Sequence, residues 1–190
     1  CNIVRIGLRI KMIETIRIDP RYSPKNKITR MVRNGSVLLS NSCIVQNEEQ
    51  KNYFSKYIHK KIHVFANPIS DKFIQAERTI DNSVIRTITA VGRLEYQKNY
   101  TMLINAFSRL ENQDLTLNIY GEGSLKGELQ GLINDLGLTN RIKLCGRTNN
   151  IKEVFMSTDL FILSSNAEGM PNSLMEAMAV GLPCISTDCP

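Results

Sequence analysis

The stretch from Val84 to Ser186 alternates regularly between short apolar runs rich in β-branched residues and amphipathic segments of helical period. This alternation predicts five strands and four helices. Strands that alternate with helices form a parallel sheet with right-handed crossover connections. We therefore expect an α/β fold in this region. The expected strands are 84–91, 115–120, 142–145, 160–163 and 184–186, and the expected helices are 100–110, 125–136, 151–156 and 173–180.

The pattern is weaker before this region. We expect strands at 12–17, 42–46 and 61–65, a helix over 27–39 and a second helix that Asn47 caps and that runs through Tyr57. The segment 67–83 is polar and contains Pro68, which favours a hinge or linker. The expected domains are therefore 1–66 and 84–190. Cys1 in place of an initiator Met, and a chain that stops at Pro190 just after a strand, lead us to expect a piece of a longer protein.

Charge is spread unevenly along the chain. Residues 1–66 hold 13 Lys and Arg against 4 Asp and Glu, a net charge of +9, whereas residues 67–190 hold 11 against 14, or −3. A basic segment favours an anionic partner, either a membrane surface or nucleic acid, although a solvated basic surface explains it equally well. No nucleic-acid-binding motif accompanies the charge, so we expect no nucleic-acid partner. No apolar run reaches the roughly 18 residues of a spanning helix, and any membrane contact would be peripheral.

Cysteine and histidine do not form a metal-binding pattern. The five cysteines are scattered without a Cys-x-x-Cys pair, as expected for thiols in a reducing cytoplasm. His59 and His63 lie four residues apart, but the Glu of a His-Glu-x-x-His zinc helix is missing. We expect no metal site and a cytoplasmic location.

The loops after the strands of 84–186 carry the candidate binding residues, because open parallel sheets bind ligands at the carboxyl ends of their strands. After the first strand, Gly92 permits a tight turn, and Arg93 and Lys98 place two cations where a diphosphate would fit. Taken alone, this segment is explained at least as well by a basic surface loop.

The next two loops contain glycines and polar groups. Gly121 and Gly123 form a tight turn at the same edge, where the backbone could approach a ligand. They are not part of a dinucleotide fingerprint, since Lys126 stands where the third glycine of Gly-x-Gly-x-x-Gly belongs. Arg147 and Thr148 follow the third strand, where main-chain groups could contact a base or ribose; a plain βα turn is the alternative.

The fourth loop holds Glu168 and leads into a helix that carries Glu176, eight residues later. A carboxylate at Glu168 can accept hydrogen bonds from sugar hydroxyls or stabilise developing positive charge. Glu176 has two interpretations, a ligand contact or the partner of Ser173 in a capping box. The helix start also directs N–H groups toward this edge, which favours a phosphate.

Together these segments resemble the retaining GT-B glycosyltransferases of family 4, also called glycosyl transferases group 1. The resemblance rests on Val91-Gly-Arg with Lys98-Asn99, on Gly121-Glu-Gly123 and above all on two glutamates separated by seven residues in a strand–loop–helix context. It extends well over 84–190 and moderately over 42–70. It implies a Rossmann-like donor domain at 84–190, preceded by the end of an N-terminal, acceptor-side Rossmann-like domain.

The resemblance implies a metal-independent, cofactor-free enzyme that transfers a sugar with retention from a nucleotide-sugar donor to an acceptor hydroxyl. Arg93 and Lys98, with Gly92, would hold the donor diphosphate. Glu168 would contact the donor sugar and support the transition state, and Glu176 would bind the ribose hydroxyls. Backbone contacts to the sugar and phosphate would come from Gly169, Met170, Asn172, Ser173 and Leu174, and the nucleotide would be lined by Gly121, Gly123, Arg147 and Thr148.

From this resemblance we expect a UDP-sugar donor, a sugar or lipid-linked acceptor and a role in cell-surface polysaccharide, lipopolysaccharide, capsule or glycolipid synthesis. The basic N-terminal part would suit peripheral contact at the inner face of the plasma membrane. Pro171 departs from the family, where Gly is common, and has no N–H to donate. Most of the N-terminal domain and the C-terminal helices are missing, so this chain alone should have little or no transferase activity. Two alternatives stay open: a non-catalytic nucleotide-sugar-binding module or degenerate transferase, and a dinucleotide-dependent oxidoreductase.

Overall fold

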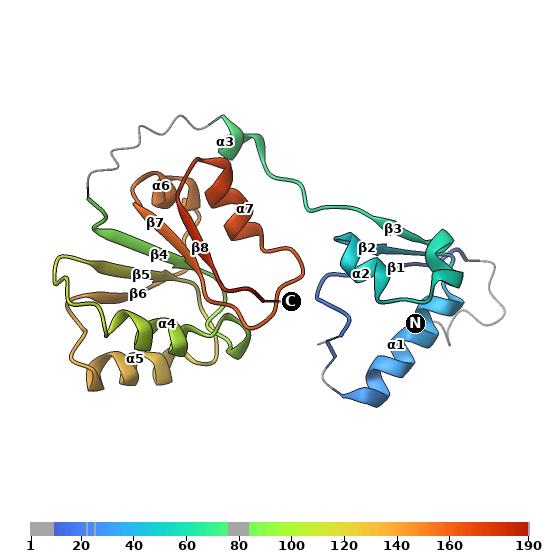
Figure 1. The fold of residues 1–190 in the computed structure, drawn as a ribbon, viewed down its shortest axis with the longest axis horizontal. Helices are drawn as coiled ribbons and strands as arrows, with labels where there is room; N and C mark the ends of the chain where they lie inside the picture. The colour runs from blue at the N-terminus through green and yellow to red at the C-terminus, as the bar shows by residue number, and fades with distance from the viewer. Residues whose placement is uncertain (1–9, 22, 25, 76–83, 190) are drawn as a thin grey trace. The chain divides into compact units, whose positions relative to one another are not determined.

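The computed structural model describes residues 10–21, 23–24, 26–75 and 84–189. Expectations that fall on 1–9 and 76–83 lie outside the described residues. The chain divides into two compact units (Figure 1). Among the described residues, the first unit comprises positions up to 68 together with 167–170, and the second comprises 69–166 and 171–189.

The first unit contains a three-stranded parallel sheet in the order β1-β2-β3, formed by β1 (Ile13–Ile16), β2 (Ser42–Val45) and β3 (Ile62–Val64). Between β1 and β2 runs α1 (Lys27–Leu39), which begins where the side chain of Asn26 accepts a hydrogen bond from the Ile28 N–H. Alternate strand residues bury one face of the sheet against α1. That core consists of Ile16, Val37, Cys43, Val45, Phe54, Ile58 and Ile62.

The helix expected from Asn47 through Tyr57 is shorter than predicted. Asn47 caps it as expected, accepting from the Gln50 N–H, but α2 covers only Glu48–Asn52. Ser55 then leaves the helical conformation, with φ −56° and ψ 136°, and a 3₁₀ helix follows at Lys56–Lys61. Asn and Ser are poor residues for a helix interior, because their side chains compete for backbone hydrogen bonds. The break in the helix accompanies the burial of Phe54 and Ile58 in the same core.

The second unit contains a five-stranded, all-parallel sheet, which confirms the predicted α/β fold. Its strand order is β6-β5-β4-β7-β8. The chain therefore builds outward from β4 in one direction and then returns to the other side of β4. A reversal of this kind creates a topological switch point, where open sheets bind ligands. The strands are β4 (Thr87–Val91), β5 (Thr116–Tyr120), β6 (Ile142–Gly146), β7 (Leu160–Leu163) and β8 (Cys184–Ser186).

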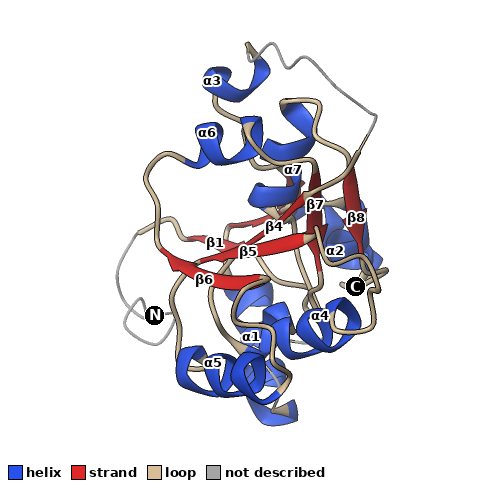
Figure 2. Cartoon of the chain, turned by 90° about the vertical axis from the view of Figure 1, so that its left-hand side faces the viewer, coloured by secondary structure: helices blue, strands red, loops and turns tan. Residues whose placement is uncertain are grey.

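Helices cover both faces of this sheet. Figures 1 and 2 show α4 (Tyr100–Phe107) and α5 (Lys126–Asp135) on one face, and α6 (Ile151–Met156) and α7 (Asn172–Ala179) on the other. Burial on both faces explains why the strands read as apolar runs without strict alternation. At the end of α5, Gly137 adopts the left-handed conformation, φ +68°, that commonly terminates a helix.

A short helix, α3 (Asp71–Ile74), lies inside the segment 67–83 that we expected to be a linker. Its Phe73 is 1% exposed. The Phe73 ring packs 6.3 Å from that of Phe155, which in turn meets Phe161 edge-on at 5.6 Å. These residues therefore anchor α3 to the core beneath α6 and α7.

Candidate functional site

A cavity of about 520 Å³ opens at the carboxyl ends of β4, β5 and β6 in the second unit. Its walls come from the loops after these strands and from α6 and α7, so segments far apart in the sequence meet at the switch point. Tyr120 and Ile151 contribute apolar surface that the sequence analysis did not single out. Six of the predicted site residues line the cavity: Gly92, Arg93, Gly121, Arg147, Thr148 and Glu176.

The first two loops of the site touch each other through their backbones. The Gly92 N–H donates to the Tyr120 carbonyl at 2.9 Å, and the Leu94 N–H donates to the Glu122 carbonyl at 3.0 Å. A Cβ on Gly121, which has φ +148°, would lie 1.9 Å from the Gly92 oxygen, and one on Gly123 would lie 2.3 Å from the Leu94 oxygen. The two glycines are thus required for packing between loops, a constraint separate from the ligand approach that we expected.

Lys98 lies beside the cavity without lining it. A Cβ on Gly92 would lie 2.5 Å from the Cε of Lys98, so the absence of a side chain at Gly92 makes room for the lysine stem. The hydroxyl of Ser164, just after β7, donates to the Lys98 carbonyl at 2.8 Å. Asn166 also donates to the Tyr96 carbonyl at 2.9 Å. The residues after β7 therefore hold the backbone of Lys98, the second of the two cations predicted to bind the diphosphate.

Glu95 is a residue that the sequence analysis missed. Its carboxylate accepts hydrogen bonds from the Ser124 N–H and the Ser124 hydroxyl, both at 2.9 Å. The main-chain bond, followed by the hydroxyl bond, lowers the pKa of Glu95 below its usual value. This pair joins the loop that holds Arg93 to the start of α5. Because the partners are 29 positions apart, no local pattern in the sequence signals the contact.

The start of α7 contradicts the capping-box interpretation. The helix begins at Asn172, follows Pro171 and has no side-chain cap. The Ser173 hydroxyl instead donates to the Val91 carbonyl at 3.2 Å. Glu176 lines the cavity, and burial raises its pKa, an effect that the nearby charge of Lys72 opposes. Glu176 is therefore placed for ligand contact.

The residues around Glu176 differ in what they offer to a ligand. Asn172 is exposed, whereas the side chain of Leu174 packs against the core under α7. The Leu174 N–H donates to the Pro171 carbonyl at 3.1 Å. The segment Ala167–Met170 belongs to the first unit, where Asn47 donates to the Gly169 carbonyl at 3.1 Å. Glu168 and Glu176 thus fall in different units.

In the described part of the chain, no group of three or more His, Cys, Asp and Glu residues could hold a metal ion. The ring of His59 lies 3.0 Å from the Phe54 carbonyl, and His63 is exposed on β3. No helix among the described residues is both long and apolar enough to cross a bilayer.

Comparison with known proteins identifies the protein family of this chain. The family model for glycosyl transferases group 1 matches residues 73–190, which contain the switch-point cavity. The chain belongs to this family. A glycosyltransferase of Methanocaldococcus jannaschii is 32% identical over 99% of the chain and 50% of its own length. A Campylobacter jejuni N-acetylgalactosaminyltransferase that acts on a diphospho-undecaprenol-linked sugar is 35% identical over 68% of the chain and 35% of its own length.

Solved structures share the fold. The Anabaena protein HepE, solved with UDP and glucose, superposes with a TM-score of 0.81 over 99% of this chain and 55% of its own, at 19% identity. Staphylococcus aureus TarM, solved with UDP, gives 0.80 over 94% of this chain and 37% of its own, at 20% identity. The α/β fold with parallel sheets is thus that of GT-B glycosyltransferases. The chain spans half or less of the length of the two curated relatives above.

Proposed function

We propose that the second unit binds the nucleotide-sugar donor of a retaining glycosyltransferase, which moves a sugar, with UDP-sugars as the favoured donors, to an acceptor hydroxyl. The observation that carries the proposal is the cavity at the switch point, which brings the Arg93 loop, Arg147 and Glu176 together. A cation, glycine-containing turns and a carboxylate are the groups that a diphosphate and a ribose require.

The roles of the residues follow from this chemistry. The Arg93 guanidinium, with Lys98 beside Gly92, neutralises the diphosphate, and Arg can make two parallel hydrogen bonds to phosphate oxygens. Glu176, as a carboxylate, accepts hydrogen bonds from the ribose hydroxyls. Backbone groups near Arg147 and Thr148 face the nucleotide. We assign Glu168 to the sugar-transfer step, where it stabilises developing positive charge on the donor sugar.

UDP is favoured because UDP-bound HepE and TarM share the fold of this chain. Relatives also support a role in cell-surface polysaccharide or glycolipid synthesis. Two Campylobacter jejuni enzymes and an Escherichia coli galactosyltransferase are named for acceptors linked to diphospho-undecaprenol. An Erwinia amylovora relative is named for amylovoran biosynthesis. We therefore propose a sugar or lipid-linked acceptor and contact with the membrane at its surface.

Donor binding is tested by calorimetry with UDP, GDP and ADP. We expect UDP to bind most tightly, and we expect Arg93→Ala to weaken UDP binding by about tenfold or more, as for the loss of a hydrogen bond to a charged group. Arg109→Ala is the matched control, since it removes an exposed arginine outside the cavity. Binding of NAD without binding of any nucleoside diphosphate would favour the oxidoreductase alternative.

Catalysis is tested by product formation with the protein expressed from its complete reading frame. Glu168→Ala should reduce turnover by about 10² to 10³ while UDP still binds. Unchanged product from this variant would exclude the catalytic role, and binding without any turnover in the parent protein would favour the non-catalytic module. Residues 1–190 alone should show little or no turnover.

A further inference from the structure

Asn166, in the loop after β7, is bonded to the segment that carries Lys98. Its main-chain N–H donates to the Gln97 carbonyl at 2.8 Å, and its side-chain amide donates to the Tyr96 carbonyl at 2.9 Å. The side-chain oxygen of Asn166 accepts a hydrogen bond from the Asn99 side chain at 2.8 Å. The same loop also bonds to the Lys98 carbonyl, so four consecutive residues are attached to it. Asn166 alone makes three of these attachments.

The backbone turns sharply at Asn99, the residue after Lys98. Asn99 adopts the left-handed conformation, with φ 49° and ψ 44°, and no other non-glycine among the described residues has a positive φ. Such a residue persists only where its surroundings hold it. Here the Asn99 side chain donates to Asn166 and also accepts from the Met102 N–H, at the start of α4, at 3.4 Å. The contact with Asn166 therefore helps to maintain the turn beside Lys98.

The side chain of Lys98 lies in a confined place. Its Cε is 2.5 Å from the point that a Cβ on Gly92 would occupy, and the Tyr100 hydroxyl is 2.9 Å from the same point. Tyr100 is 3% exposed and packs in the core of the second unit. The lysine stem thus lies against the cavity-lining Gly92 and beside a buried aromatic side chain. A lysine stem is normally flexible, but here the position of its backbone determines where the ammonium group can lie.

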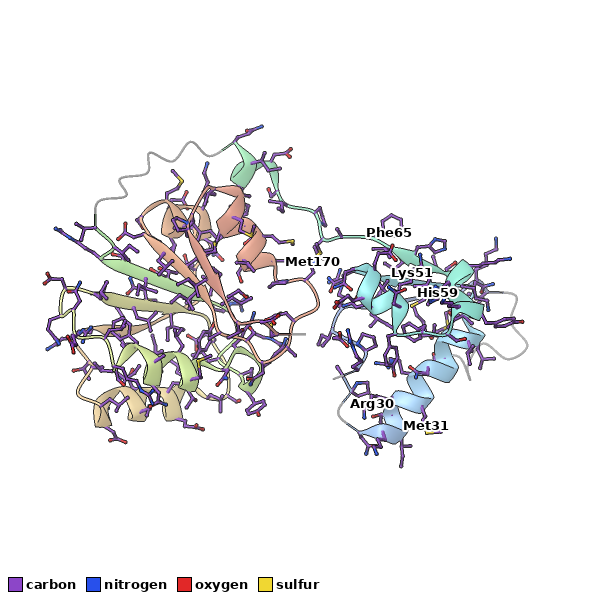
Figure 3. The ribbon with its side chains drawn as sticks, in the orientation of Figure 1. Arg30, Met31, Lys51, His59, Phe65 and Met170 are labelled. Atoms are coloured by element: carbon purple, nitrogen blue, oxygen red, sulfur yellow. The ribbon has the colours of Figure 1, made fainter. Side chains whose placement is uncertain are left out.

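Asn166 is also the last residue of its stretch that belongs to the second unit. The next four residues, 167–170, belong to the first unit and make their contacts there. Figure 3 labels Met170, whose carbonyl accepts a hydrogen bond from the Asn67 side chain at 3.3 Å. The bonds of Asn166 to 96–99, in contrast, lie within the second unit, which also contains the switch-point cavity.

We propose that Asn166 is a positioning residue for Lys98, which it holds so that the ammonium group reaches the donor diphosphate from beside Gly92. This inference rests on the proposed role of Lys98 in binding the diphosphate. Asn166 does not line the cavity, so it acts through Lys98 and not by contact with the ligand. A cation that is already held in place loses less conformational freedom when the phosphate binds, and this gain appears as affinity.

A double-mutant cycle tests the positioning role by calorimetry with UDP, on the protein expressed from its complete reading frame. Lys98→Ala should weaken UDP binding about tenfold or more, and Asn166→Ala about fivefold, as for the loss of a charged and of a neutral hydrogen bond. In the Lys98→Ala background, Asn166→Ala should have no further effect, because it acts through the lysine. Asn105→Ala is the matched control, since it removes another exposed amide, which bonds to its own helix, and it should leave UDP binding unchanged. Additive losses in the double variant overturn the proposal.

A second ligand and a second variant distinguish positioning from a general structural role. Uridine lacks the diphosphate, so its binding should be the same in wild type and in Asn166→Ala. Asn99→Gly removes the side-chain bond to Asn166 but permits the left-handed backbone, and glycine is tolerated at the helix start. It should weaken UDP binding about threefold with the melting temperature retained. Equal losses for uridine and UDP overturn the positioning role.

The results also separate this inference from the proposed function. If the wild-type protein does not bind UDP, the proposed donor binding and the role of Asn166 are both overturned. If Lys98→Ala weakens UDP binding and Asn166→Ala does not, donor binding is supported and the positioning role of Asn166 alone is overturned.

Discussion

The hydroxyl of Ser173 donates to the main-chain carbonyl of Val91 at 3.2 Å. This bond ties the first turn of α7 to the last residue of β4, on one wall of the cavity. Glu176 lies one turn further along α7, so the bond also fixes the position of the Glu176 carboxylate in the cavity wall. A residue expected to cap its own helix thus positions that helix on the sheet.

Replacement of Ser173 tests this positioning role. Ser173→Ala should lower the free energy of unfolding by about 1 kcal/mol and weaken UDP binding, because α7 loses its attachment to β4. Ser157→Ala is the control, since its exposed hydroxyl bonds to carbonyls of its own helix, and it should change stability by less than about 0.5 kcal/mol. Urea unfolding and calorimetry measure the two effects. An intact UDP affinity would contradict the role.

Glycine substitutions should separate loop packing from helix propensity. Gly121→Ala should destabilise the protein by about 2 kcal/mol or more, because its Cβ would overlap the Gly92 carbonyl and its φ of +148° suits only glycine. Gly131→Ala, in the interior of α5 with open space around it, should stabilise by about 0.5–1 kcal/mol. In urea unfolding, we expect the free energy of unfolding to fall in Gly121→Ala and to rise in Gly131→Ala.

Glu176→Gln should affect stability and binding in opposite directions. Burial raises the pKa of Glu176, so the folded protein holds the ionised form at a cost, and wild-type stability falls as pH rises above the usual value of 4.5 toward the raised one. The amide removes that cost, so stability at neutral pH should hold or rise slightly, while UDP binds more weakly. A structural role for Glu176 predicts that both quantities fall together. Thermal melts measure the stability and calorimetry measures UDP binding on the same samples, so the two roles of Glu176 can be distinguished.

Glu95 predicts a pH dependence of the opposite sign. Its pKa is lowered, chiefly by the Ser124 N–H, so its contribution to stability is present above the usual value of 4.5 and is lost as pH falls through the lower folded value. The melting-temperature difference between wild type and Glu95→Gln should therefore shrink as the pH drops below about 4.5. Glu111→Gln, at an exposed loop position, serves as the control. A difference that stays constant with pH would contradict the Ser124 contact.

Several features of the fold were predictable because they depend on local patterns. The bounds of α1, α6, β7 and β8 match the predicted ranges, since apolar period and turn residues are read directly from neighbouring positions. The prediction of one continuous helix from Asn47 through Tyr57 was wrong. The helix is interrupted at Ser55, where the flanking Phe54 and Ile58 pack into the core. Local propensity gives way where packing of distant segments sets the backbone.

By itself, the sequence determined that residues 84–186 form a parallel α/β sheet with candidate ligand groups at one edge, because the alternation of periods and the order of loops are properties of the chain alone. Only the tertiary structure decided how those groups are used. In the folded protein, Ser173 bonds to the Val91 carbonyl instead of capping its own helix, and Glu176 lines the cavity. Gly121 and Gly123 are needed for packing between loops, and Glu95 accepts a hydrogen bond from Ser124. The reason is physical: these partners lie far apart in sequence, and only the strand order β6-β5-β4-β7-β8 brings them within bonding distance.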